Sequence, residues 1–476
     1  MSGTPNEHRE DEPPLLTLVT PTDAVDARAA GTSSAGATSD DHGRRPDRRS
    51  TRLRVARRNA ARTATRARRT GISLLFFPVF TMVLLVDAVR GLRDLVRRTR
   101  TTDAELQPSF QRPASMPAPE ERTIEEIMAA IEALPYRPAR ISTQHAFFRD
   151  NGPDAIGGLL TTNPQVSSMP HLYPSTFRPE LFTGSGGEQI AGMRAMHDHP
   201  GPALVICHGL LMTKSFDAII QIARRAYEQW GFHVVTIDLR GWGQSAWTTS
   251  APSSASFHEG ADLVEVCREL HRSHLVTSVG ALGYSLGGAT VMRAAQISSL
   301  ADDTPLDGGG LAVSAPTDME AALAHISTKP TWRDPGFGLW QVFRSTIRST
   351  VRYRGMHREI TTWRGMVQAL SLPWYGVSYE QFCADASALE FAHEITVPVL
   401  DIHAEDDFLI PVEHALRLRE AVADNPNVQV LLRDAGAHVS FGAVDSRWYH
   451  SVLRQWFEYW ATPGEFVAGP PPTSER

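Results

Sequence analysis

Cysteine is scarce in this sequence, and no metal-binding motif stands out. Cys207, Cys267 and Cys383 are the three cysteines in 476 residues, they lie far apart, and none forms a CxxC pair. An odd number of widely spaced thiols excludes a disulfide framework, and the spacing does not indicate a zinc site. We therefore expect three buried structural thiols and no bound metal.

Long uncharged apolar segments are also scarce. The run from Ile72 to Val86 carries no charge but contains Pro78. A helix of this length extends about 22 Å, which is less than the roughly 30 Å hydrocarbon core of a bilayer. A full span would have to include residues 71 to 89. The run also lies too far from Met1 for an ordinary secretory signal peptide.

Lysine is absent from residues 44–100, which nevertheless hold 17 Arg and three acids and so carry a charge of +14. Because the whole chain carries −6, the remainder is near −20. This asymmetry indicates an arm with an anionic partner of its own. We expect residues 44–100 to bind a membrane surface, with a helix docked on the rest of the protein as an alternative and nucleic acid as the least favoured partner. A monotopic anchor on the cytoplasmic side of the cytoplasmic membrane fits the short apolar run.

After a glycine-rich hairpin at residues 181–196, strand-like and helix-like segments alternate. The apolar, β-like runs are residues 203–207, 233–239, 276–282, 310–315, 397–403 and 428–433. Such alternation predicts an α/β fold with a mostly parallel central sheet and helices on both faces. The apolar fraction of 42% is sufficient for a sizeable core.

Residues 316–395 interrupt this alternation with helix-like sequence that is rich in aromatic side chains. Those side chains are Trp332, Phe337, Trp340, Phe343, Tyr353, Trp363, Trp374 and Tyr375. Aromatic residues at helical spacing usually pack inward, so an ordinary helical core is one interpretation. The other is a helical lid that supplies an apolar wall to a site.

The segment GYSLGG places Ser285 between Gly283 and Gly287, after an apolar β-like run and before a helix-like one. A sharp turn from strand to helix exposes the residue at its apex but leaves no room for Cβ atoms two positions away on either side. The pattern predicts a nucleophile elbow with Ser285 as the nucleophile. A serine hydroxyl needs a base, an orienting acid and oxyanion donors.

Candidates for these partners lie where other predicted strands end. The segment CHGLL follows one strand, so the N–H of Leu210 can face the cleft together with the N–H of Leu286. His438 lies in the loop GAHVSFG after the last predicted strand. For DLRGWGQS (238–245), which also ends a strand, a purely structural loop is the favoured interpretation.

Three acids, Glu405, Asp406 and Asp407, follow the strand at 397–403 and compete to orient His438. The chain order of serine, acid and histidine is the order of the α/β-hydrolase triad. Asp407 is favoured over Asp406, for which a solvated or turn-capping carboxylate is the alternative.

Residues from about 180 to 460 resemble the α/β-hydrolase superfamily in the segments HGLL, DLRGWGQS, GYSLGG, EDDFLIP and GAHVSF. The acid-to-proline spacing of Asp407 and Pro411 matches that family. The segments YEQFCADAS and ITVPVLDIHAEDDFLIP, together with the anchor-like arm, resemble the branch of membrane-associated esterases and lipases among hydrolase-domain proteins. Ala437 stands where that branch usually has glycine. The resemblance implies a nucleophile, acid, base and two main-chain oxyanion donors: Ser285, Asp407, His438, Leu210 and Leu286.

We expect a serine hydrolase that cleaves carboxylic esters of small molecules or lipids through an acyl-enzyme, without a metal or organic cofactor. An acyltransferase would use the same triad, and a non-catalytic binding protein on the same fold is a further alternative. The sequence does not predict the oligomeric state.

The expected organisation has five parts. They are a disordered Arg-rich arm (1–70), a membrane-anchor-like helix (71–106), a linker and extension (107–180), an α/β-hydrolase domain (181–462) with its lid at 316–395, and a disordered tail (463–476).

Overall fold

The computed structural model describes residues 117, 121–141, 143, 146–147, 173–328, 347 and 360–462. The predicted arm (1–70), anchor-like helix (71–106) and tail (463–476) lie outside these residues, as does most of the predicted linker. None of the helices in the described part of the chain is long and apolar enough to cross a membrane.

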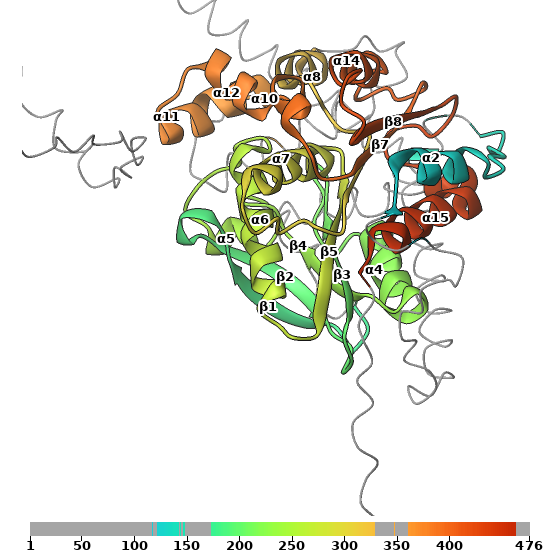
Figure 1. Ribbon diagram of the computed structural model, residues 1–476. Helices are drawn as coiled ribbons and strands as arrows, with labels where there is room; N and C mark the ends of the chain where they lie inside the picture. The colour runs from blue at the N-terminus through green and yellow to red at the C-terminus, as the bar shows by residue number, and fades with distance from the viewer. Residues whose placement is uncertain are drawn as a thin grey trace, which may run out of the picture. The chain divides into compact units, whose positions relative to one another are not determined.

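An eight-stranded sheet with the order β1-β2-β4-β3-β5-β6-β7-β8 runs through the described residues (Figure 1). Its strands are β1 (Arg178–Thr183), β2 (Gln189–Ala195), β3 (Gly201–Cys207), β4 (His233–Ile237), β5 (Val276–Tyr284), β6 (Gly310–Val313), β7 (Val399–Ala404) and β8 (Val428–Arg433). β1 pairs with β2 and β2 with β4 in antiparallel fashion, whereas every pair from β4 to β8 is parallel. The predicted hairpin and the mostly parallel sheet are thus confirmed.

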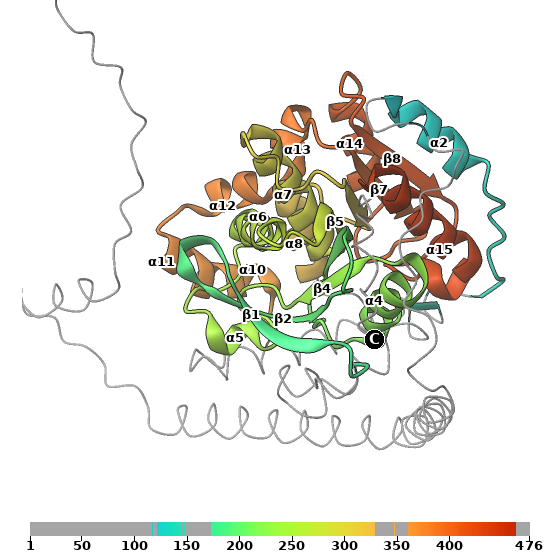
Figure 2. The ribbon, with the colours of Figure 1, turned by 60° about the horizontal axis from the view of Figure 1, so that its bottom comes forward.

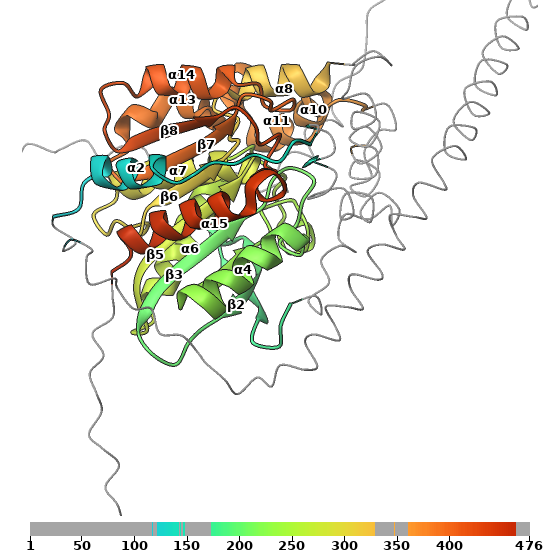
Figure 3. The same ribbon diagram turned by 90° about the vertical axis from the view of Figure 1, so that its right-hand side faces the viewer.

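Helices cover both faces of this sheet, as the sequence predicted. α2 (Ile124–Glu132), α4 (Asp217–Trp230) and α15 (Phe441–Trp460) lie on one face, and α6 (Phe257–His271) and α7 (Leu286–Leu300) lie on the other (Figures 2 and 3). The shorter helices are α5 (Ser245–Thr248), α8 (Met319–Ser327), α10 (Trp363–Met366), α11 (Leu372–Tyr375), α12 (Tyr379–Ala386), α13 (Ala388–Phe391), α14 (Glu413–Ala421), η5 (Ser185–Gly187), η6 (Val367–Ser371) and η7 (Ala392–Glu394).

The N-cap of α2, Thr123, lacks one bond of a reciprocal capping box, in which the Glu126 side chain would accept from the N–H of Thr123. The Thr123 hydroxyl accepts a hydrogen bond from the N–H of Glu126. The N–H of Thr123 donates instead to the hydroxyl of Tyr459 on α15, and that hydroxyl donates to the Glu126 carboxylate. A tertiary contact therefore replaces half of the box and fastens α2 to α15.

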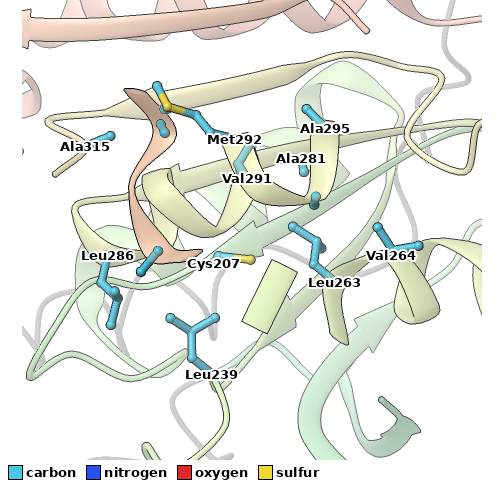
Figure 4. Close-up of a cluster of buried hydrophobic side chains, with 14 of the residues drawn as sticks. Cys207, Leu239, Leu263, Val264, Ala281, Leu286, Val291, Met292, Ala295 and Ala315 are labelled. Carbon is cyan, nitrogen blue, oxygen red and sulfur yellow. The ribbon is translucent and has the colours of Figure 1, made fainter. Parts of the chain in front are cut away.

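The cysteines are free and buried, as expected. Cys207 and Cys267 are fully buried in the apolar layer between the sheet and α6 and α7, where Cys207 lies near Leu286 and Leu239 (Figure 4). Burial raises the pKa of Cys383 to about 11. Such thiols are unreactive packing groups.

In the segment between β6 and β7, the described residues form α8, α10, α11, α12 and α13, together with η6 and η7. Trp363 is buried in the core, whereas Trp374 is 44% exposed. The other tryptophans and the phenylalanines that suggested a lid lie outside the described residues. Ser371 and Tyr375 donate hydrogen bonds to the carbonyls of Ser253 and Pro252, which fastens this segment to the loop before α6.

His197 makes the fold sensitive to acid. Its ring is 2% exposed, stacks on Tyr227 at 4.1 Å between centroids, and neither ring nitrogen has a hydrogen bond of normal geometry in the described chain. Burial, aided by His233 and His199, lowers its pKa to about 4. The unfolded chain therefore takes up a proton below pH ~6.5 that the folded protein takes up only near pH 4.

We expect the free energy of unfolding to fall by about 2 to 3 kcal/mol as the pH drops from about 6.5 to about 4, in addition to other acid effects. Replacing His197 by Phe, which keeps a ring on Tyr227, should remove this component. Urea melts at several pH values measure it, with His274→Gln at an exposed position as the control. An identical pH dependence in His197→Phe would refute the assignment.

Candidate active site

Ser285 occupies the turn between β5 and α7 with φ 52° and ψ −116°, a backbone conformation that non-glycine residues rarely adopt. A Cβ on Gly283 would lie 2.0 Å from the carbonyl oxygen of Gly287. A Cβ on Gly287 would lie 2.6 Å from the carbonyl oxygens of Cys207 and His208. Both neighbouring groups are backbone, so neither glycine tolerates a side chain, and the turn has the geometry of a nucleophile elbow.

Main-chain hydrogen bonds hold the elbow on both sides. The N–H of Ser285 donates to the carbonyl of Val313 at the end of β6, at 2.8 Å. The carbonyl of Ser285 accepts from the N–H groups of Gly288 and Ala289. The Ser285 hydroxyl makes no hydrogen bond within the described residues, so it is free to face a substrate.

The His-Gly loop after β3 lies directly against the elbow. A Cβ on Gly209 would lie 3.0 Å from the Cβ of Ser285. Nε2 of the buried His208 accepts from the N–H of Leu239 at 3.0 Å, so its Nδ1 carries the hydrogen and donates to the carbonyl of Gly209 at 2.8 Å. The buried His208 thus holds the backbone of this loop in place through both of its ring nitrogens.

The two predicted oxyanion donors flank Ser285. Leu286 follows it as the first residue of α7, and Leu210 follows Gly209 in the loop. Neither N–H has a hydrogen-bond partner in the part of the chain that the structure describes. Leu211 adopts φ 66°, and strained backbone of this kind is common at functional sites.

A buried ion pair anchors the far end of the same loop. Lys214, one of two lysines in the chain, donates from Nζ to Asp238 Oδ2 at 2.5 Å, and both side chains are fully buried. The N–H groups of Lys214 and Gln244 also donate to this carboxylate. Asp238 is the first residue of DLRGWGQS, so that segment positions the loop beside Ser285. This role agrees with the purely structural interpretation of the segment that the sequence favoured.

His438 and Asp407 lie in hydrogen-bond contact. His438 Nδ1 is 2.9 Å from Asp407 Oδ2 and 3.2 Å from Oδ1, and both residues are buried. Asp407 Oδ1 also accepts from the N–H groups of Leu409 and Ile410, each at 2.9 Å. Burial alone would raise the pKa of Asp407, but His438, His403 and the N–H of Ile410 together outweigh it, so the pKa lies below its usual value. The carboxylate therefore stays ionised and can orient the imidazole.

The two neighbouring acids have different surroundings. Glu405 is exposed, whereas Asp406 is half-buried and accepts from the N–H of Ala437 at 2.8 Å and from the hydroxyl of Thr143 at 2.9 Å. Asp406 therefore holds the loop that carries His438. Ala437 has φ 48°, a left-handed conformation that glycine adopts without strain, and this explains why glycine is usual at its position in the resembling branch.

The loops that carry Ser285 and His438 meet at the end of β6. The N–H of Val439 donates to the hydroxyl of Ser314 at 3.3 Å, one residue after Val313, which accepts from Ser285. No direct hydrogen bond joins Ser285 and His438 within the described residues. Such bonds are often long until a substrate is bound.

Sequence reasoning missed the contribution of Thr143 and Phe147. Phe147 is 6% exposed, and its ring lies 6.4 Å from the His438 ring and 5.4 Å from the Phe408 ring, between centroids. Together with Thr143, which bonds Asp406, it brings the N-terminal extension to the site. No local sequence motif indicates this contact. Among the described residues, no group of three or more His, Cys, Asp or Glu could hold a metal ion.

The family model for serine aminopeptidase, S33, matches residues 198–443, which is just over half of the chain. The chain therefore belongs to this family of the α/β-hydrolase superfamily, and it is a serine hydrolase. The matched range includes the elbow, the His-Gly loop, Asp407 and His438. No curated protein sequence matches the chain significantly.

Solved structures with a similar chain course include an esterase of Pyrococcus furiosus (16% identity, covering 60% of this chain and 92% of that chain, TM-score 0.44). A puromycin-hydrolyzing peptidase of Mycobacterium tuberculosis (16%, 60% and 41%, TM-score 0.41) and an acylaminoacyl peptidase of Pyrococcus horikoshii (16%, 59% and 40%, TM-score 0.38) are further examples. At these TM-scores the likenesses add nothing to the family match.

Proposed function

We propose that this serine hydrolase cleaves carboxylic esters with an apolar, lipid-like acyl group, using Ser285, His438 and Asp407. The observation that carries the proposal is the strained elbow at Ser285, with a buried carboxylate on the base. Beside the elbow lie two main-chain N–H groups that have no partner among the described residues. Leu210 and Leu211 are half-buried next to the elbow, and Phe147 and Phe408 lie beside the His438 loop. These side chains suit an apolar acyl chain.

In the proposed reaction, His438 Nε2 takes the proton of the Ser285 hydroxyl as Oγ attacks the ester carbonyl carbon. The N–H groups of Leu210 and Leu286 stabilise the oxyanion. Collapse of this intermediate breaks the bond to the alcohol, which receives the proton from His438, and leaves an acyl-enzyme. Water then gives a proton to His438 as it attacks the acyl carbon. The bond from the acyl carbon to Oγ breaks, His438 returns the proton to Oγ, and the acid is released.

A peptidase is the second candidate, because the matching family is described as serine aminopeptidase. The same triad can attack an amide, and an acyltransferase would pass the acyl group to an alcohol or amine instead of water. A series of p-nitrophenyl esters of increasing chain length, compared with aminoacyl p-nitroanilides, separates the first two. Product analysis with an added acceptor alcohol detects acyl transfer. Faster turnover of anilides than of any ester would overturn the ester proposal.

We also propose that the basic residues 44–100 bring the enzyme to an anionic membrane surface, because an excess of 14 positive charges favours such lipids. A variant that lacks residues 1–106 keeps Arg122, which bonds the Ala461 carbonyl, and α2. We expect this variant to remain in the supernatant after membrane sedimentation and to hydrolyse short esters. Sedimentation with membranes in carbonate would show that the attachment lies elsewhere.

A further inference from the structure

Asp401 is a buried acid for which the reaction above has no use. It lies within β7, is fully buried, and neither of its oxygens has a hydrogen bond of normal geometry in the described chain. Its partners across the sheet are Ala312 on β6 and Val430 on β8. A carboxylate whose oxygens lack hydrogen bonds of normal geometry is costly to bury in an apolar sheet, so its presence needs a cause outside packing.

The nearest ionisable side chain is that of His403, two residues along the same strand and therefore on the same face of the sheet. Its Nδ1 is 3.9 Å from Asp401 Oδ2 and likewise lacks a hydrogen bond in the described residues. Its Nε2 is 2.8 Å from the carbonyl oxygen of Ile410 and 3.9 Å from Asp407 Oδ2. Because a carbonyl only accepts, Nε2 carries a hydrogen, and Nδ1 faces Asp401 with either a lone pair or a second proton.

Asp401, His403, Asp407 and His438 thus form one row of ionisable groups that ends at the catalytic base. We propose that Asp401 and His403 hold one proton between them behind Asp407, and that the charge of this pair sets the pH at which His438 becomes an active base. Both are positioning residues, since they act through Asp407. The inference rests on the proposed role of His438.

The Asp401–His403 pair changes charge near the pH at which an ordinary histidine side chain loses its proton. It is neutral while it holds the shared proton and carries −1 after losing it. Burial raises the pKa of Asp401 to about 6, against the opposing effects of His403 and the main-chain amide of Ala315. A negative pair stabilises the imidazolium of His438, so the wild-type base loses its proton at a higher pH than it would beside a neutral pair.

Other ionisable groups around the pair do not produce this effect. His414 on α14 interacts electrostatically with His403, and burial lowers its pKa to about 4, so it is neutral at neutral pH. Asp318 and Arg417 lie beyond His414 and form an ion pair with each other. Asp407 remains ionised beside His438.

The test measures the rate at which a fluorophosphonate labels Ser285 between about pH 5 and about pH 9. Asp401→Asn preserves the shape of the side chain, Asp401→Leu removes its polarity, and Glu405→Gln removes an exposed carboxylate as the matched control. We expect the acid midpoint of labelling to fall by about 0.5 to 1 pH unit in both Asp401 variants and to stay unchanged in the control. One pH unit below the wild-type midpoint, labelling should be about 3- to 5-fold faster.

Coincident midpoints in the wild type and in the folded Asp401 variants would overturn the inference, as would an equal shift in Glu405→Gln. Melting curves establish folding, and a lowered melting temperature with an unshifted midpoint would assign Asp401 a structural role instead. Labelling requires only a reactive serine. Labelled enzyme that turns over no ester would therefore refute the ester proposal. It would say nothing about the Asp401–His403 pair, because the labelling midpoints alone test the role of that pair.

Discussion

Replacing Ser285 by alanine is expected to lower kcat for a short ester by about 10⁵- to 10⁶-fold while the fold survives. The residual rate would come from substrate binding and the oxyanion donors, which the substitution leaves in place. Alanine keeps a Cβ, so the strained backbone with φ 52° is equally accessible. The lost hydroxyl makes no hydrogen bond in the described chain, and the melting temperature should change by less than about 2 °C.

The matched control is Ser299→Ala, which removes a hydroxyl from the far end of the same helix α7. Its hydroxyl donates to the Ala295 carbonyl and accepts from the N–H of Thr396, remote from the elbow. This variant should retain full turnover and labelling, with some loss of stability. Fluorophosphonate labelling that persists in Ser285→Ala would refute the assignment of the nucleophile.

The elbow could be predicted from the sequence because its cause is local. Gly283 and Gly287 are required by contacts within a few residues and with the adjacent strand, and those contacts leave a readable spacing. The parallel sheet was equally accessible, since each apolar run and its following helix repeat the same unit. β4 ends at Ile237, two residues before the predicted run does, and the next residue, Asp238, accepts a hydrogen bond from Lys214.

Other parts of the site have no local signature. Thr143 meets Asp406 across 263 positions of the chain, and Phe147 reaches His438 in the same way. Asp401 reads as an interruption in an apolar strand, and only the structure shows that its Oδ2 lies 3.9 Å from Nδ1 of His403. Contacts of this kind depend on tertiary packing, which sequence patterns do not encode.

The choice among three acids shows where the sequence alone reached its limit. Spacing to Pro411 favoured Asp407, but neighbouring side chains at a strand end diverge, and spacing cannot say where each one points. In the structure Asp407 contacts His438, Asp406 contacts Ala437, and Glu405 faces solvent. The role predicted for Asp407 is now supported by its contact with His438 as well as by its spacing to Pro411. Kinetic measurements can test it.

Asp407→Asn is expected to lower kcat by about 10²- to 10⁴-fold. The N–H groups of Leu409 and Ile410 both donate to Oδ1, so the amide oxygen of asparagine must occupy that position. Its NH₂ group then faces Nδ1 of His438, which has to present a lone pair there. The proton moves to Nε2, and the imidazole can no longer accept from Ser285.

Asp406→Asn should change kcat by less than about 5-fold, because an amide oxygen can still accept from the N–H of Ala437 and the loop keeps its course. Its NH₂ group can donate to the hydroxyl of Thr143, which reverses that bond without breaking it. Measuring kcat for both variants on one short ester, with melting curves for each, compares an orienting acid with a loop anchor. A larger loss in Asp406→Asn than in Asp407→Asn would mean that the contact between Asp407 and His438 is not the one that prepares the base.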